Sequence, residues 1–479
     1  MAPTNPTDNL SPYNFHRVAS LLAQATPEEA SLDNLDPAED DFALPTTTEE
    51  VTINLDQPIT IEEAVDLALK NNRDLREAEL TVDVARKQLD AALGAQYPSL
   101  AVQGTGINSN TAATELGNVQ LSDANPTVDD ETLGIESSTT SFSGDLTLNY
   151  DIYTGGSRGA SIRLARAQLE INELALEVAI EQTIFETKED YYDLQDADSQ
   201  VEISKIAVSD AAQTLKDAEL MEDAGLGTKF DVLRAEVELA NAQQSLNTAE
   251  SNLSTAQSQL VETLSLREKV NVTAKDEIVK VGEWNLSLTE SIITAYGNRQ
   301  ELQQFLLNKD INLEQKKLAL SVIRPTFSVF GQVDAIEVLD DDVNATTGYT
   351  VGATVAWTIF DGGTAKANAR VEDVNVSITE NNFADQRNNV KFEVEQAYFG
   401  LKSNEKNIVT AEKAVELAKE SLRLARLRFQ AGVGTQTDVI EAQTELTTAR
   451  GNVLGAIINY NQSFNQIERA VTNVTRSQS

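Results

Sequence analysis

Charged side chains follow two glycine-rich turns at matching positions along the chain. The segment AGLGTKFDVLRAEVELANAQ (224–243) returns as AGVGTQTDVIEAQTELTTAR (431–450), a shift of 207 residues. Asp231 and Asp438 fall in the first turn of the helix predicted after each turn, where the helix dipole favours a carboxylate. Arg234 and Glu441 lie three residues further on. The simplest chemistry for the two aspartates is helix capping.

Residue types that perform most enzyme chemistry are scarce. The chain has no cysteine, and its one histidine, His16, lies in an acidic, proline-rich segment. No acid–base cluster stands out, and the Gly-Gly pairs lack the Gly-Lys-Ser/Thr of a phosphate loop. We therefore expect a protein that is not an enzyme, with no metal site and no cofactor. The acidic run 340–342 could bind divalent cations, but a solvated loop is the simpler interpretation.

Charge and hydropathy argue against further classes. The chain carries 76 acidic and 37 basic residues, a formal net charge of -39. Nucleic acid is not an expected partner, because phosphate binding needs clustered Lys and Arg. No run of about 18 apolar residues predicts a transmembrane helix. The first residues, MAPTNPTDNL, show no basic and apolar leader, so we expect a mature N-terminus whose export needs a leader absent from this sequence.

Residues 1–57 differ from the rest of the chain. They hold six of the ten prolines, and 11 acidic residues against one basic residue, Arg17. This composition predicts a disordered, solvated extension. The short apolar patch 18–23 is either a docking helix or, more simply, a nascent helix in a flexible tail.

The remainder is an internal duplication. Residues 61–80 align with 288–307 at a shift of 227, whereas NYDIYTGG (149–156) aligns with AWTIFDGG (356–363) at a shift of 207. The difference of 20 residues predicts a longer polar loop in the first half, roughly 111–138. The predicted segments are the extension 1–57, a first repeat 58–282, a second repeat 283–470 and a C-terminal tail 471–479.

Each repeat has the predicted order helix, strand, long loop, strand, very long helix, tight turn, long helix. No Gly or Pro occurs from 160 to 224, and Gly400 is the one interruption of the counterpart, 364–431. After each turn, apolar residues recur at alternating spacings of three and four, as in a coiled-coil seam. The seams are Val232, Ala235, Leu239, Ala242, Leu246, Ala249, Leu253, Ala256 and Leu260, then Val439, Ala442, Leu446, Ala449, Val453, Ala456 and Tyr460. Two adjoining seams in 160–224 indicate two neighbouring helices, as in a wall or tube.

The repeated turns predict the tips of helical hairpins. Both glycines of each turn, Gly225 with Gly227 and Gly432 with Gly434, are expected to have positive φ. Thr228 and Thr435 are placed to cap the helices that follow.

Alternation with a period of two predicts strands at 145–153 and about 350–359, and partner strands at 98–106 and 325–333. One apolar and one small polar face fits a lipid-facing barrel strand and a soluble sandwich strand nearly equally. Four strands cannot close a barrel, and open edges do not occur in lipid, so a barrel requires several chains.

Over residues 58–470 the sequence resembles the TolC-like outer-membrane efflux proteins. The resemblance rests on the duplicated halves, the aromatic-x-Gly-Gly exit from a strand (153–156 and 360–363) and the Asp-Val after each glycine turn. It implies a homotrimer in the outer membrane of a Gram-negative-type bacterium, reaching into the periplasm. The implied fold is mainly α: a long antiparallel coiled-coil α-barrel continuous with a trimeric 12-stranded transmembrane β-barrel, four strands per chain.

The resemblance also implies a passive export duct of a tripartite efflux or type I secretion system, gated at its helical tips. Its partners would be outer-membrane lipid, a periplasmic adaptor protein and, through the adaptor, an inner-membrane transporter. Adaptor contact is expected at Gly225, Leu226, Gly227, Thr228, Gly432, Val433, Gly434 and Thr435.

Asp438 and Glu441 would ring the periplasmic aperture, although capping alone accounts well for Asp438. Six carboxylates in a trimer would attract cations. The family's Tyr and Arg lock does not carry over, because Phe429 and Gly434 occupy the matching positions. Our hypothesis is that Arg234, beside Asp231, pairs with the acids of the neighbouring tip and helps hold the closed state.

A soluble coiled-coil scaffold is the alternative. It accounts for the heptads and the acidity, and it predicts a monomer or dimer in buffer without detergent.

Overall fold

The computed structural model describes residues 46–48, 55–124, 126–127, 138–266, 270–339 and 345–471. His16, the patch 18–23 and the acidic run 340–342 lie outside the described residues. The chain divides into two compact units. One contains Met1–Thr81, Leu174–Gln303 and Ala384–Ser479, and the other contains Val82–Glu173 and Gln304–Phe383.

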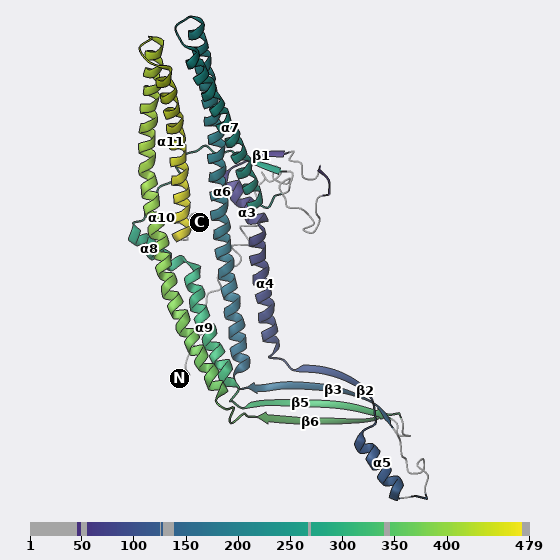
Figure 1. Cartoon of the computed structure of the whole chain (residues 1–479). Coiled ribbons are helices and arrows are strands. Elements are labelled where there is room, and N and C mark those ends of the chain that lie inside the picture. Colours follow the sequence, from purple (N-terminus) through teal and green to yellow (C-terminus); the bar gives the residue numbers. More distant parts are fainter. Residues whose placement is uncertain are drawn as a thin grey trace, which may run out of the picture. The chain divides into compact units, whose positions relative to one another are not determined.

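Two helical hairpins dominate the first unit (Figure 1). One joins α6 (Ser157–Asp223) to α7 (Lys229–Thr263), and the other joins α10 (Thr364–Gln430) to α11 (Gln436–Val471). The predicted long helices are thus confirmed. Gly400 does not interrupt α10; a Cβ built at this glycine would lie 3.9 Å from Ser463 Oγ of α11.

The predicted seams of α7 and α11 are the buried faces of these helices. Every seam residue of both helices is buried or half-buried. One cluster packs Val232 and Ala235 of α7 against Ala218 of α6, and another packs Val439 and Leu446 of α11 against Leu422 of α10. Alanine at alternate seam positions leaves room for close helix approach, because its side chain ends at Cβ.

The shorter helices are broken where the sequence predicted continuous ones. The helix predicted at the start of the first repeat is α3 (Ile61–Asn71) followed by α4 (Arg73–Gly94). Its counterpart in the second repeat is α8 (Leu288–Asn298) followed by α9 (Gln300–Ser321). Asn72 and Arg299 separate them with ψ values of 129° and 113°. At Asn72, Oδ1 accepts from the Leu75 N–H at 2.9 Å and Nδ2 donates to the Thr263 carbonyl at 3.0 Å, so the break is stabilised by side-chain hydrogen bonds.

A small parallel sheet pairs β1 (Leu55–Ile59) with β4 (Val270–Ala274), and the sequence did not predict it. β1 includes residues 55–57, which the sequence assigned to the disordered extension, so that boundary falls inside a strand. Tyr191 of α6 is fully buried against this sheet. Its hydroxyl lies 3.0 Å from the Ile59 carbonyl and 2.9 Å from the Asp276 carboxylate.

The second unit contains an antiparallel sheet of four strands in the order β2-β3-β5-β6 (Figure 1). The strands are β2 (Ser99–Ser109), β3 (Thr139–Thr154), β5 (Thr326–Val338) and β6 (Thr346–Ala356). The predicted loop between β2 and β3 contains a helix, α5 (Ala112–Ala124), which is a correction. Trp357 and Ile359 lie beyond β6, so the predicted fourth strand ends earlier than expected.

The register of this sheet separates its residues into two faces. Leu100, Leu148, Gly331 and Val351 are aligned across the four strands, as are Val102, Leu146, Val333 and Tyr349. The intervening line is Ala101, Thr147, Gln332 and Thr350. One face is therefore apolar across all four strands and the other is largely small or polar. Among the described residues, none of the helices is both long and apolar enough to span a membrane.

Candidate functional site

The first hairpin tip closes α6 with a turn that needs glycine. Gly225 has φ +70°, and its N–H donates to the Glu222 carbonyl at 2.9 Å. The Leu226 N–H donates to the Met221 carbonyl at 2.8 Å. This 6→1 and 5→2 pair satisfies carbonyls at the helix end, and the left-handed backbone at its centre disfavours residues with a Cβ.

The second tip repeats this geometry at the end of α10. Gly432 has φ +73°, and its N–H donates to the Phe429 carbonyl at 3.0 Å, while the Val433 N–H donates to the Arg428 carbonyl at 3.0 Å. The duplication in the sequence therefore corresponds to two tips with the same backbone hydrogen bonds.

The second glycine of each turn has a different role from the one predicted. Neither Gly227 nor Gly434 has positive φ. A Cβ at Gly227 would lie 3.1 Å from Met221 Cβ, and one at Gly434 would lie 3.0 Å from Arg428 Cβ. Glycine is needed here because the chain passes close to the preceding helix.

Capping boxes start α7 and α11. The Thr228 N–H donates to Asp231 Oδ2 at 3.0 Å, and the Thr435 N–H donates to Asp438 Oδ2 at 2.8 Å. In return, the Thr228 and Thr435 hydroxyls accept the N–H of each aspartate. The Thr435 N–H and hydroxyl hold the pKa of Asp438 below its usual range. Asp438 is therefore an ionised capping residue, while Glu441 is exposed one turn further along.

The tips expose apolar side chains. Leu226 and Val433 follow the positive-φ glycines and are 76% and 69% exposed. In this type of helix end, the residue at that position often packs back onto the helix. Phe230 is also exposed at the first tip.

Polar contacts join the two hairpins near their tips. Arg234 Nη1 donates to Thr437 Oγ1 at 2.7 Å, which brings Arg234 to the residue beside Asp438. Ion pairs that involve Arg234 are absent from the part of the chain that the structure describes. Deeper in, the Thr214 hydroxyl donates to Gln443 Oε1 at 3.0 Å, and both side chains are buried.

Sequence reasoning missed Gln443 and Gln436, although a signal was present. Both are buried, and they stand seven residues apart beside the apolar seam of α11. Two glutamines at heptad spacing next to a seam indicate a polar contact with a second helix.

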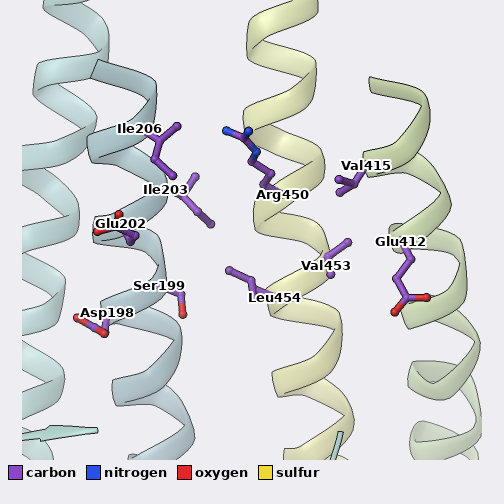
Figure 2. Close-up of a pocket in the computed structure, with 10 residues that line it drawn as sticks. All are labelled: Asp198, Ser199, Glu202, Ile203, Ile206, Glu412, Val415, Arg450, Val453 and Leu454. Carbon is purple, nitrogen blue, oxygen red and sulfur yellow. The ribbon is translucent and has the colours of Figure 1, made fainter. Parts of the chain in front are cut away.

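A groove of about 570 Å³ lies further from the tips, between α6, α10 and α11 (Figure 2). Ile203 of α6 and Leu454 of α11 face each other across it. Its lining includes three carboxylates, Asp198, Glu202 and Glu412, and one cation, Arg450. In the described ranges, no group of three or more side chains could hold a metal ion.

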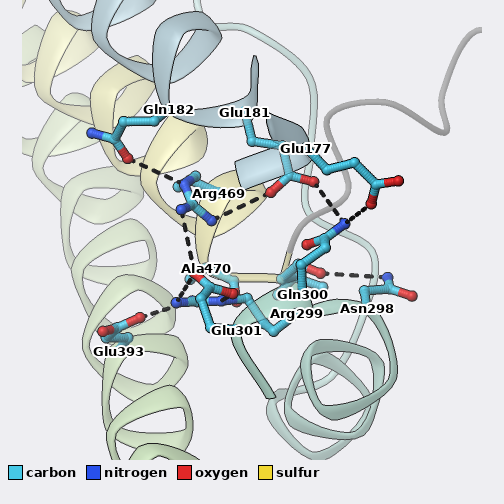
Figure 3. Close-up of polar contacts among 11 residues, drawn as sticks. Glu177, Glu181, Gln182, Asn298, Arg299, Gln300, Glu301, Glu393, Arg469 and Ala470 are labelled. Atoms are coloured by element: carbon cyan, nitrogen blue, oxygen red, sulfur yellow. Dashed lines mark hydrogen bonds and ion pairs between the residues drawn. The ribbon is translucent and has the colours of Figure 1, made fainter. Parts of the chain in front are cut away.

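A buried ionic network surrounds the break between α8 and α9 (Figure 3). Arg299, 5% exposed, is paired with Glu301 through two nitrogens at 3.0 Å and with Glu393 of α10 at 2.8 Å. Burial disfavours the guanidinium charge, but these carboxylates outweigh it and raise the pKa of Arg299. Arg469 of α11 adds contacts of 3.5 Å with Glu181 of α6 and with Glu301.

Comparisons with known proteins agree with this architecture. The structure of the Campylobacter jejuni CmeC outer membrane channel is similar with a TM-score of 0.72 and 17% identity, covering 91% of this chain and 94% of that chain. The outer membrane protein VceC from Vibrio cholerae gives a TM-score of 0.69 and 16% identity, covering 86% and 95%. The fold is that of outer-membrane channels with an α-barrel and a β-barrel part.

The chain also matches the outer membrane efflux protein family over residues 64–265 and 293–473, and it belongs to that family. The outer membrane efflux protein BepC of Brucella suis biovar 1 (strain 1330) is 27% identical over 163 residues. That match spans 34% of this chain and 35% of the relative. The predicted family is confirmed, and so is the predicted fold class of a long α-helical barrel with a β-barrel part, while the trimer and its strand count stay predictions. The chain is an outer-membrane protein that extends into the periplasm.

Proposed function

We propose that the protein is the export duct of a tripartite efflux or type I secretion system. It acts as a passive conduit across the periplasm and the outer membrane, gated at its helical tips. Membership of the outer membrane efflux protein family supports the export role. Within the described chain, the two tips are where matching turns, capping boxes and exposed apolar side chains occur together, and this supports a docking role for them.

A homotrimer with a 12-stranded barrel is the assembly we propose. The sheet order leaves β2 and β6 as edge strands within one chain. Lipid cannot satisfy unpaired backbone groups at such edges, so each edge needs a strand from another copy. The apolar face supports this assignment, since Val102 and Val351 are each 80% exposed in the single chain.

Exposed apolar residues on α10 support the helical part of the assembly. Phe392 and Phe399 are exposed and lie seven residues apart, and Leu417 and Leu424 repeat this spacing. Because residues seven apart lie on one face of a helix, each pair forms a short apolar stripe that a helix of a neighbouring copy would cover.

The single observation that carries the docking proposal is the duplicated tip. Two turns with the same hydrogen bonds present Leu226 and Val433 at the same position, both highly exposed. Such a pair suits the apolar tip of a periplasmic adaptor, which would also contact the adjacent glycines and threonines. The adaptor would connect the duct to an inner-membrane transporter.

The aperture proposal assigns Asp438 and Glu441 to the periplasmic entrance. Arg234, together with Asp231 on the same helix, would hold neighbouring tips together. The bond from Arg234 to Thr437 supports the idea that this arginine reaches the second tip.

The docking test replaces Leu226 and Val433 with Asp in one variant. We expect normal amounts of trimer in the outer membrane but loss of export, because the new carboxylate at each tip would be buried without a partner in an apolar interface. Trimer formation is measured on gels as a heat-sensitive band, and export as release of transported substrate by cells that depend on this duct.

The matched control exchanges the two residues, Leu226→Val with Val433→Leu, and should keep export intact. Export that survives both aspartates would show that the adaptor does not use these tips.

Gly225→Val and Gly432→Val should also block assembly with the adaptor, since valine disfavours positive φ. A water-soluble monomer without detergent would instead support the soluble scaffold.

A further inference from the structure

Two glutamates on α6 share an unusual arrangement with amide side chains from the second repeat. Glu189 is hydrogen-bonded to Asn465 of α11, and Glu181 is hydrogen-bonded to Gln300 at the start of α9. In both pairs the amide nitrogen donates to the carboxylate, while the amide oxygen is buried without a hydrogen bond. Only three buried side-chain atoms in the described ranges are in that condition, and these pairs contain two of them.

The Glu189 pair is the better defined. Asn465 is 2% exposed, and its Nδ2 donates to Glu189 Oε1 at 2.7 Å and to the Phe185 carbonyl at 3.0 Å. Both partners are acceptors, so the amide cannot be turned around without placing its oxygen against them. Asn465 Oδ1 therefore needs a donor that an ionised glutamate cannot supply.

The Glu181 pair repeats the pattern (Figure 3). Gln300 Nε2 donates to Glu177 Oε2 at 3.2 Å and to Glu181 Oε1 at 3.4 Å, again two acceptors. Glu181 is 2% exposed, and Arg469 approaches its other oxygen at 3.5 Å. This pair is looser and has a cation nearby.

The charges around Glu189 favour its neutral form. Asp190 and Asp193 are the acidic neighbours on its own helix, and the nearby Lys188 is paired with Glu468 of α11 at 3.1 Å. Burial raises the pKa of Glu189 to about 7, although the hydrogen bond from Asn465 opposes the shift. Burial likewise raises the pKa of Glu181 to about 7, with Arg469 opposing it.

We propose that Glu189 and Asn465 form a proton-binding site that joins the two repeats of the chain. Glu189 takes a proton from water and donates it to Asn465 Oδ1, while Asn465 Nδ2 donates to the other carboxyl oxygen. The closed acid–amide pair holds α6 of the first repeat to α11 of the second. Glu181 and Gln300 form a second, weaker pair of the same kind.

The direction of the pH effect follows from the raised pKa. The proton stabilises the contact most at low pH, and this contribution is lost as the pH rises through about 7. Between pH 6 and pH 8, the equilibrium constant for local opening of the α6–α11 contact should rise about tenfold, because Glu189 is already ionised in the opened state over this range and the gain from ionisation levels off above about pH 7, once the closed state is ionised too. Acid therefore tightens the contact between the repeats.

The test uses Glu189→Gln in the assembled, detergent-solubilised protein. The glutamine amide can donate to Asn465 Oδ1 at every pH, so it imitates the protonated acid. Hydrogen exchange of peptides covering 183–193 and 460–468, corrected for the intrinsic rate at each pH, reports the local opening. Wild-type protection should fall about tenfold from pH 6 to pH 8, whereas the variant should keep its pH 6 protection throughout.

Glu202→Gln is the control, because it removes the same charge from an exposed position on the same helix. It should retain the wild-type pH dependence. An unchanged pH dependence in Glu189→Gln would overturn the proposal, as would its loss in Glu202→Gln.

A measurement on the wild-type protein checks the proton itself. Infrared absorption of protonated carboxyl groups should show a band that titrates near pH 7 and is diminished in Glu189→Gln. Absence of any such band at pH 6 would show that Glu189 is ionised and would contradict the proposal.

Discussion

Asp438 and Glu441 lie in the same helix, yet their carboxylates have different surroundings. Asp438 caps α11 through the Thr435 N–H, and the low pKa that results keeps it charged. Glu441 is exposed and lies one turn further along. If both line an aperture, Glu441 is the carboxylate that can reorient toward a passing cation, because the capping bond fixes Asp438.

Arg234→Ala tests the gate at the level of one side chain. Loss of the bond to Thr437 should weaken the contact between tips by about 0.5–1 kcal/mol, the usual net value of an exposed hydrogen bond. We expect a higher single-channel conductance or more frequent openings in planar bilayers. Lys229→Ala is the matched control, because the ion pair of Lys229 within the described residues is with Glu222 of its own hairpin. If neither the conductance nor the opening frequency exceeds that of the wild type, Arg234 has no gating role.

Residue-level prediction from the sequence succeeded where the cause was local. Positive φ at Gly225 and Gly432 and capping by Thr228 and Thr435 follow from adjacent residues. The second glycines were misread, because their requirement comes from the end of the preceding helix, where a Cβ on either glycine would lie only 3.0–3.1 Å from Cβ of Arg428 or Met221. The sequence did not indicate that Thr437 is the partner of Arg234, because that contact depends on how two hairpins pack.

At the scale of elements, the periodic helices were predictable and their interruptions were not. Heptad seams run over many residues and predicted α7 and α11 with their buried faces. β1 and β4 have five residues each and pair across more than 200 positions, so no local pattern indicated the sheet. This sheet also explains why Tyr191 is fully buried while its counterpart in the second repeat, Tyr398, is only half-buried.

Arg299 lies at the break between α8 and α9 and pairs there with Glu301 and Glu393, which gives an element-scale prediction. Arg299→Ala would leave the half-buried Glu301 with Arg469 as its cation, and about 3–5 kcal/mol, the cost of breaking a fully buried ion pair, is the upper limit of the loss. We expect lower thermal stability of the assembled protein and faster hydrogen exchange in α8 and the end of α11. Arg299→Met, which fills the volume but leaves the same carboxylate, should also destabilise the protein.

Arg423→Ala is the control for this experiment, because its pair with Glu420 is exposed and lies within one helix. It should leave thermal stability unchanged. Equal stability of Arg299→Ala and wild type would show that the network does not maintain the helix break.

At the scale of the whole molecule, the four-stranded sheet links the fold to the membrane. Its register places mostly apolar residues on one face and mostly small or polar residues on the other. The polar face includes Asp145 opposite Asp334. Two carboxylates directly opposite each other are destabilising unless water or cations separate them. This arrangement suits a water-filled lumen, with the apolar face toward lipid.

Arginine substitutions at two adjacent residues of β3 test this orientation. Leu146 and Thr147 lie near the middle of the strand on opposite faces. Leu146→Arg should reduce the stability of the assembled barrel by about 2–4 kcal/mol, the cost of arginine on a lipid-facing strand near the bilayer centre. Thr147→Arg should assemble nearly normally, because its side chain would enter water in the lumen. Both are measured by folding into lipid vesicles and by the temperature at which the trimer dissociates on a gel. If Thr147→Arg were the variant that fails to assemble, the apolar face would be covered by protein rather than by lipid, and the barrel orientation proposed here would be reversed.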